Sequence, residues 1–105
     1  NDFLAYELAT CINALCFKKR NKIFVLDKKK SSQLLKGYQS VRKLSLKEKN
    51  NLNTLCRGSA LRYLLTRSYD FLNTPKNAII KIKDPLEYLH KLNLHRNLNS
   101  FKDYS

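Results

Sequence analysis

The chain has 105 residues and a formal net charge of +13 at pH 7, from 21 lysines and arginines against 8 carboxylates. A chain of this length forms one domain at most, and much of its apolar surface stays uncovered. Its longest apolar run, residues 4–17, is interrupted by polar side chains and is shorter than the roughly 20 residues that cross a membrane. We therefore expect a single small domain with no membrane partner.

Basic residues gather between residues 17 and 50, where 12 lysines and arginines stand against Asp27 and Glu48. Such a block attracts phosphate backbones or anionic lipid without specifying either. The 15 lysines and 11 asparagines of the chain also match the bias that an AT-rich genome gives to any protein. A basic helical nucleic-acid-binding module is therefore one candidate function, although nucleic acid is not the partner we expect.

The cysteines and histidines lack the spacing of a metal site. Cys11 and Cys16 are five residues apart on an expected helix, so their side chains diverge by about 140°. His90 and His95 repeat this spacing, and no carboxylate pattern joins them. We expect surface histidines, no metal, no disulfide, and three buried structural thiols in a cytoplasmic protein.

The first predicted helix begins at Asp2, a residue type that caps helices, and its apolar residues recur every three or four positions. The expected inner face holds Leu4, Leu8, Ile12 and Leu15, with Cys11 beside them. The opposite face holds Asp2, Tyr6, Ala9 and Asn13. Residues 18–30 are predicted to form a solvated connection, with at most one extended segment at 23–26.

A second helix is expected to start at Ser31 or Ser32, with Leu34, Leu35, Tyr38 and Val41 inward. Further on, "SLKE" at 45–48 has the spacing of a capping box, which satisfies backbone donors from both directions. A short helix should begin there and weaken at "NNLN", residues 50–53, before a long helix over about 53–72. Pro75 then disfavours a helical Thr74 and ends that helix.

The last part of the chain contains the clearest helix start. Residues 78–82 are a short strand or an extended loop, and "DPLE" at 84–87 supplies a capping Asp, a proline and a first-turn glutamate. This helix should run to about Leu94, and residues 97–105 should form a loosely held tail. The predicted fold is all-α, with four or five helices in one domain over residues 1–96.

The long helix divides into two arcs at about 100° per residue. One arc is mostly apolar: Ala60, Leu61, Leu64, Leu65, Ser68, Tyr69, Phe71 and Leu72. The other is mostly polar: Ser59, Arg62, Tyr63, Thr66, Arg67, Asp70 and Asn73. Arg67 can pair with Asp70 across one turn. The polar arc is either a solvated face or a binding site, and it has arginine, whose planar fork suits carboxylates and phosphates, but no lysine.

No complete catalytic apparatus is visible in the sequence. There is no glycine-rich phosphate loop, no Ser-His-Asp or Cys-His arrangement, and no pair of carboxylates on one helix face. Composition and spacing alone predict a basic, helical piece of something larger, and the absence of any methionine agrees with this expectation.

Four stretches, in order, resemble the C-terminal end of homoserine kinases built on the aminoglycoside phosphotransferase and choline kinase fold. They are "NDFLAYELATCINALCF" at 1–17, "LLKGYQSVRKLSLKEK" at 34–49, "RGSALRYLLTRSYDF" at 57–71 and "KDPLEYLHKL" at 83–92. "YELA" is similar to the family's "YDLA", and "LRYLLTRSYDF" is similar to its "SR-YD" helix. Phe3 and Glu7 depart from the family's proline and aspartate at the entry to the first helix.

The resemblance implies a helical C-lobe portion of a protein-kinase-like fold, without its N-terminal lobe and catalytic loop. Such enzymes transfer the γ-phosphoryl group of ATP to the homoserine hydroxyl in threonine synthesis, with Mg²⁺ neutralising the developing charge. The nucleotide lobe and the metal-binding residues would belong to an upstream part, so the chain alone should be inactive and bind neither ATP nor Mg²⁺. A non-enzymatic remnant of a split gene is an alternative.

The resemblance also suggests where homoserine would bind, since its carboxylate needs a cation and its ammonium group an anion. Arg62 or Arg67 is the candidate for the carboxylate, and Asp70 or Asp2 for the ammonium group. Two further side chains, Tyr63 and Asn13, are expected to orient the substrate. The competing interpretation is a structural role, in which Arg67 and Asp70 pair to tie the long helix to a neighbour.

Overall fold

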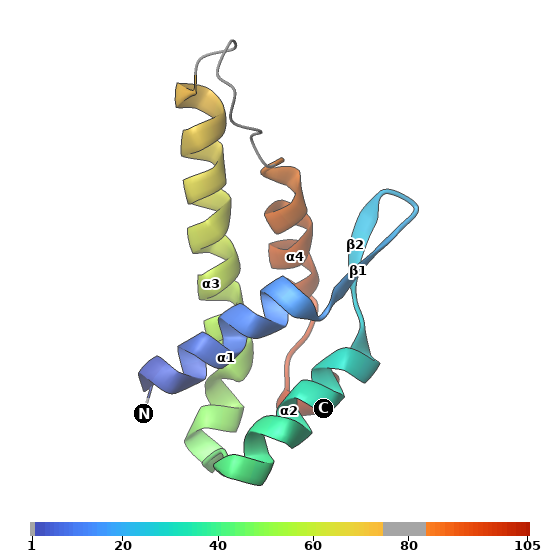
Figure 1. The fold of residues 1–105 in the computed structure, drawn as a ribbon, viewed down its shortest axis with the longest axis vertical. Coiled ribbons are helices and arrows are strands. Elements are labelled where there is room, and N and C mark those ends of the chain that lie inside the picture. The colour runs from blue at the N-terminus through green and yellow to red at the C-terminus, as the bar shows by residue number, and fades with distance from the viewer. Residues whose placement is uncertain (1, 75–83) are drawn as a thin grey trace.

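The computed structural model describes residues 2–74 and 84–105, with side chains from residue 4 onward (Figure 1). In chain order the elements are α1 (Asp2–Leu15), β1 (Phe17–Arg20), β2 (Ile23–Leu26), α2 (Lys28–Val41), α3 (Leu46–Asn73), α4 (Leu86–Arg96) and the 3₁₀ turn η1 (Phe101–Asp103). The described residues are mostly helical, as predicted. The all-α expectation needs one correction, because β1 and β2 form a small sheet.

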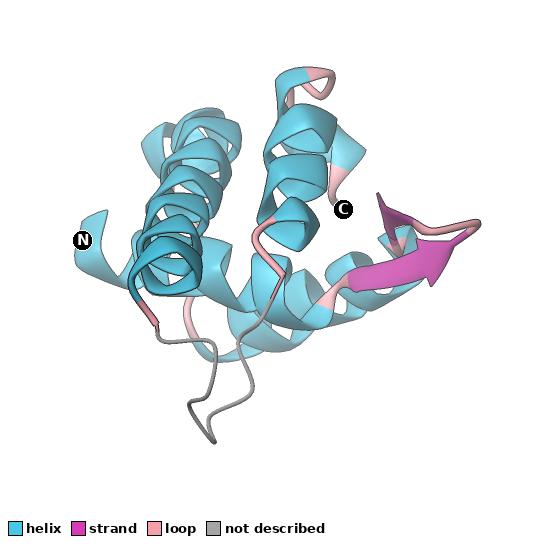
Figure 2. Cartoon of the chain, turned by 90° about the horizontal axis from the view of Figure 1, so that it is seen from above, coloured by secondary structure: helices cyan, strands magenta, loops and turns pink. Residues whose placement is uncertain are grey.

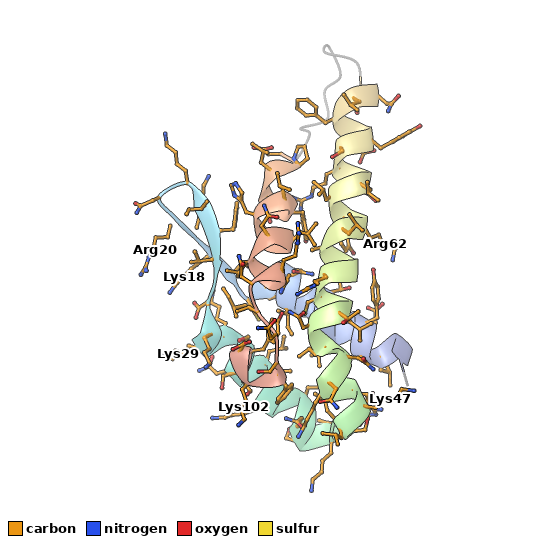
Figure 3. All side chains as sticks on the ribbon, turned by 180° about the vertical axis from the view of Figure 1, so that it is seen from behind. Lys18, Arg20, Lys29, Lys47, Arg62 and Lys102 are labelled. Carbon is orange, nitrogen blue, oxygen red and sulfur yellow. The ribbon has the colours of Figure 1, made fainter. Side chains whose placement is uncertain are left out.

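Helix α4 stands beside the long helix α3, and α1 crosses α3 on one face (Figure 1). Viewed from above, the hairpin lies on the side of α4 away from α3 (Figure 2). Lys18 and Arg20 of the hairpin and Lys29 of α2 project along one edge of the molecule (Figure 3). Much of the predicted basic block is therefore exposed at the hairpin and α2.

The hairpin replaces the connection expected at residues 18–30. Its strands are antiparallel, with Phe17 opposite Leu26 and Arg20 opposite Ile23. Asn21 and Lys22 form the turn with φ of 50° and 69°, the pair of positive values that matches the twist of two joined strands. The sequence signal was present in part, because asparagine adopts positive φ more readily than most residues, but lysine at the second position concealed it.

Helix α2 begins earlier than predicted because Asp27 caps it. The Asp27 side chain accepts a hydrogen bond from the backbone N–H of Lys30 at 3.3 Å. Ser31, the expected start, lies inside the helix and is buried, and its hydroxyl donates to the backbone oxygen of Tyr104. Leu35 is buried as expected, whereas Val41 is exposed.

Helix α3 confirms the predicted capping box and contradicts the predicted break. The Glu48 backbone N–H donates to Ser45 Oγ at 3.1 Å, and Ser45 N–H donates to Glu48 Oε1 at 2.9 Å. These bonds, with one from Arg42, hold the pKa of Glu48 at about 2. The helix continues through residues 50–53 because Leu52 and Asn53 are buried, and this packing outweighs weak helix propensity.

Helix α4 starts close to the predicted position, where Asp84 Oδ1 accepts from the Leu86 backbone N–H at 2.9 Å. It ends at Arg96, two residues beyond the expected end. Residues 97–105 differ from the expected loose tail, because Tyr104 is fully buried and hydrogen-bonded. The extended segment predicted at 78–82 lies outside the described residues.

The core forms where α1, α2, α3 and the C-terminal residues meet. Its members are Leu8, Ala9, Ile12, Cys16, Leu35, Leu44, Leu52, Cys56 and Tyr104. Helix α1 is rotated from the prediction, because Ala9 and Asn13 are buried while Leu4 and Leu15 are exposed. Burial raises the pKa of Cys16 to about 11 and of Cys56 to about 12, so both remain thiols, as expected of structural cysteines.

Across the described part of the chain, no helix combines the length and the apolar character that crossing a membrane requires.

Candidate functional site

The polar arc of α3 is divided between α4 and solvent, because Tyr63 and Arg67 lie against α4 whereas Arg62, Thr66 and Asp70 are exposed. Along α3 the buried positions Leu52, Cys56 and Ser59 lead into Tyr63 and Arg67, which are half-buried. These positions are three or four residues apart, so they form one ridge on the helix. Of the leucines in the mostly apolar arc, Leu61, Leu65 and Leu72 are exposed and Leu64 is half-buried. The buried side of α3 therefore crosses the boundary between the two predicted arcs.

Arg67 is held by α4 through a charge and a ring. Its Nη1 donates to Glu87 Oε1 at 2.9 Å, and its guanidinium lies 4.3 Å from the ring centre of Tyr88. The Tyr63 ring stacks on the same Tyr88 ring, with 5.2 Å between centres. Arg67 thus ties α3 to a neighbouring helix, as the structural interpretation expected, but its partner is Glu87 and not Asp70.

Lys91 is a buried cation at the centre of this contact. Its Nζ donates to Glu87 Oε2 at 2.7 Å and to the Asn13 backbone oxygen at 2.6 Å. Three aromatic rings surround it, with Nζ 4.5 Å from the ring centre of Tyr88, 5.3 Å from Phe17 and 5.5 Å from Phe24. Such faces attract a cation electrostatically. We call Arg67, Glu87, Tyr88 and Lys91 the Lys91 cluster.

In the Lys91 cluster, burial and hydrogen bonding shift the pKa values of Glu87 and Lys91 in opposite directions. Burial on its own would raise the pKa of Glu87, but hydrogen bonds from Lys91 and Arg67 outweigh it and hold this pKa below its usual value. Burial lowers the pKa of Lys91, and the bond to Glu87 opposes that shift. One carboxylate therefore serves two cations, and removing it would leave both uncompensated.

A second polar group, the polar core network, joins α1, α3, α4 and the C-terminal residues through Asn13, Asn53, His95 and Tyr104. His95 Nε2 lies 2.6 Å from Asn13 Oδ1, which can only accept, so Nε2 carries the proton. His95 Nδ1 therefore accepts from the Tyr104 hydroxyl at 2.8 Å. Asn53 Nδ2 donates to that hydroxyl at 2.8 Å. The network fixes one tautomer of a fully buried histidine.

Burial, with Arg57 and Lys91 nearby, lowers the pKa of His95 to about 4. His95 is therefore neutral at physiological pH. The surface position predicted for His95 is wrong, since its side chain is part of the core.

The six predicted substrate residues do not converge on one described site. Asn13 is buried in the polar core network, and its Nδ2 donates to the Cys56 backbone oxygen at 3.1 Å. Tyr63 and Arg67 lie against α4. Arg62 and Asp70 are exposed, and Arg62 points away from α4 (Figure 3). Asp2 belongs to the first turn of α1.

Arg62 has a partner on α1. A hydrogen bond with Tyr6 is the main reason that the pKa of Arg62 is raised above its ordinary value. Asp2 stands one turn before Tyr6 in the sequence of α1. Arg62 is thus the candidate cation that adjoins the N-terminal half of α1.

Sequence analysis missed Glu87, Lys91, His95 and Tyr104. A signal existed for the first two, because a glutamate four residues before a lysine on one helix is the favoured ion-pair spacing. That spacing does not reveal burial, which comes from the hairpin rings Phe17 and Phe24. His95 and Tyr104 bond to each other across nine residues, and their other partners are 42 to 82 residues away, so no local pattern connects them.

A shallow hollow of about 440 Å³ opens between the hairpin and the start of α4. Its described lining residues are Lys19, Lys22, Phe24, Asp84, Leu86, Glu87 and His90. The lining mixes both charges. The six predicted substrate residues are not among these lining positions.

Within residues 2–74 and 84–105, no three His, Cys, Asp or Glu side chains are grouped so that they could hold a metal ion.

No family model matches the chain. The chain is 51% identical over 104 residues to a protein named homoserine kinase from Sinorhizobium fredii, covering 99% of this chain and 31% of that protein. It is also 51% identical to homoserine kinase from Agrobacterium fabrum, with the same two shares. For homoserine kinase from Xanthobacter autotrophicus the identity is 50% over 103 residues, 98% of this chain and 31% of the relative. The chain spans about a third of the length of the curated relatives it matches.

Proposed function

We propose that the chain is the C-terminal, substrate-side part of an ATP-dependent homoserine kinase of the aminoglycoside phosphotransferase-like type. The observation that carries this proposal is 51% identity to a homoserine kinase over 104 of the 105 residues. The similarity includes every described helix, so it extends beyond one local motif. The reaction would transfer the γ-phosphoryl group of ATP to the hydroxyl of homoserine.

In this proposal, the chain supplies a scaffold and substrate contacts, and the upstream part supplies the chemistry. Phosphoryl transfer depends mainly on positioning and on stabilising charge, so a rigid helical platform can contribute to it without a reacting residue. The Lys91 cluster and the polar core network provide that rigidity, because each joins helices that are distant in sequence. Mg²⁺ would be held by the upstream part.

Among the two candidate arginines, the geometry favours Arg62 for the homoserine carboxylate. Arg67 is already paired with Glu87 and stacked on Tyr88. Arg62 is exposed, and its partner among the described side chains is the Tyr6 hydroxyl and not a carboxylate, so its guanidinium can reach a ligand. For the ammonium group, Asp2 and Asp70 both remain candidates, and Asn13 and Tyr63 act through packing.

The test fuses this chain to the part of the Sinorhizobium fredii enzyme that precedes the matched region. ADP release that requires both ATP and homoserine is the expected result, and a fusion with a native melting transition but no homoserine-dependent release would contradict the proposal. Arg62→Ala should then raise KM for homoserine about tenfold, the loss typical of one charged contact. Arg62→Lys, as the matched control, should recover part of it.

A further inference from the structure

The outer face of α3 carries an apolar stripe that the described residues leave uncovered. Its members are Leu61, Leu65, Tyr69 and Leu72, with exposed fractions of 45%, 61%, 67% and 79%. They are three or four residues apart, so they lie along one side of the helix. A row of large apolar side chains that is this exposed typically marks an interaction surface. We call these four residues the leucine stripe.

The composition around the leucine stripe is that of an interface. The chain has 15 lysines, yet none occurs between residues 50 and 75. Of the charged residues there, Arg57 and Arg67 contact α4, and Arg62 and Asp70 are exposed. Interface cores are depleted in lysine and enriched in arginine and tyrosine relative to the remaining surface. This half of α3 is therefore built differently from the lysine-rich surface of the hairpin and α2.

The relatives indicate what covers it. They are about three times as long as this chain, so roughly two thirds of each lies outside the matched region. Helix α1 starts beside α3, where Tyr6 and Arg62 are hydrogen-bonded (Figure 1). A polypeptide that joins α1 at its first turn would thus enter next to the stripe. A second copy fits less well, because each copy has a net charge of +13 and like charges repel.

We propose that the leucine stripe is the docking surface for the upstream part of the kinase polypeptide. This inference rests on the proposed function for the identity of its partner. In the assembled protein α3 would be buried on both sides, with the Lys91 cluster on one and the upstream part on the other. Tyr63 and Arg67 then face inward because their partners on α4 satisfy them, and the leucines of the stripe face outward because their partner is elsewhere in the polypeptide.

The experiment compares cysteine labelling in the chain alone and in the fusion with the Sinorhizobium fredii part. A Leu65→Cys variant, in a Cys11→Ser background, should react with a maleimide about tenfold more slowly in the fusion, because docking protects the site. The matched control is Val41→Cys at an α2 position that is 90% exposed, and it should react equally in both proteins. Equal rates for Leu65→Cys, or equal protection of Val41→Cys, would overturn the proposal.

A second measurement does not depend on labelling. The double variant Leu65→Glu with Leu72→Glu should lower Tm of the fusion by about 5 °C or more and leave Tm of the chain alone unchanged. Glutamate at the exposed positions Val41 and Leu46 is the control and should change neither. Protection of Leu65→Cys in the chain alone, lost on dilution, would instead identify a second copy as the partner and overturn the proposal.

The two proposals can fail separately. If the fusion protects Leu65→Cys but releases no ADP with homoserine, the docking surface is supported and the homoserine kinase function is contradicted. If the fusion is active with homoserine but Leu65→Cys reacts as fast as in the chain alone, the function is supported and the docking surface is contradicted. If the fusion is insoluble, the same labelling is run on the two polypeptides after co-expression, with the same outcomes.

Discussion

The two sides of α3 do not follow the two arcs that its composition predicts. The inner side carries an arginine and a tyrosine that are fixed by α4, and the outer side carries three leucines and a tyrosine in solvent. A helical wheel treats polar residues as outward because an unpaired charge is costly to bury. Here Glu87 removes that cost, so the polar side can face inward. Amphipathicity shows that a helix has two faces, and the partners decide which face is buried.

The largest effect is expected at Glu87, whose carboxylate pairs with Arg67 on the inner side of α3 and with Lys91 on α4. Glu87→Gln should lower the free energy of unfolding by about 3 kcal/mol, since Arg67 and the buried Lys91 lose their common counter-charge. Urea titration followed by circular dichroism measures this. Glu7→Gln at an exposed position on α1 is the control and should change stability by less than about 0.5 kcal/mol.

Low pH should destabilise the folded chain through His95, which belongs to the polar core network. The pKa of His95 is about 4 in the folded state and ordinarily 6.5, so between these values the unfolded chain binds a proton that the folded chain does not. The free energy of unfolding should therefore fall as pH decreases from 6.5 to 4, by about 3 kcal/mol in total. Denaturant titrations across this range test it. A His95→Gln variant should lose this dependence, and a wild-type curve that is flat from 6.5 to 4 would contradict the neutral buried histidine.

The variants Arg67→Ala and Arg62→Ala of this chain measure how much each side of α3 contributes to stability, because the two arginines lie on different sides of this helix. Arg67→Ala should cost about 2 kcal/mol, since it removes a charged hydrogen bond and the contact with Tyr88. Arg62→Ala should cost less than about 0.5 kcal/mol, as is usual for an exposed surface residue. Thermal unfolding of both variants gives the difference, and equal losses would show that the two sides are energetically alike.

The smallest effect is expected on the outer side of the isolated chain. Leu65→Glu replaces an exposed apolar side chain, so stability should change by less than about 0.5 kcal/mol. Solubility should rise because an apolar patch is interrupted. Unfolding and light scattering on the same samples measure the two properties, and a large loss of stability would mean that Leu65 is packed within the chain.

Sequence reasoning identified most helices, because their starts are local events. Ser45 with Glu48, and Asp84 before Leu86, act within one turn and were recognised from spacing alone. The continuity of α3 through Asn50 and Asn51 could not be predicted in this way, since it depends on the burial of Leu52 and Asn53 by other elements. The same limit explains the rotation of α1, whose inner face was assigned from leucine positions alone.

The candidate site was less predictable than the fold. The six residues suggested for homoserine were chosen by charge on individual helices, and the structure places Asn13 in the core and Arg62 on the side of α3 that points away from α4 (Figure 3). A ligand site is formed by several elements together, so the residue types on one helix are not enough to predict it. Substrate binding by the exposed candidates stays a prediction.

The three rings around Lys91 make its amine a built-in reporter of hairpin position. Phe17 and Phe24 come from the two strands and Tyr88 from α4, so the amine is enclosed only while the hairpin is seated on that helix. Because only 2% of Lys91 is exposed, a reagent that acylates surface lysines can reach this amine only after the hairpin moves away from α4. The acylation rate at this one amine therefore reports how often the hairpin separates from α4.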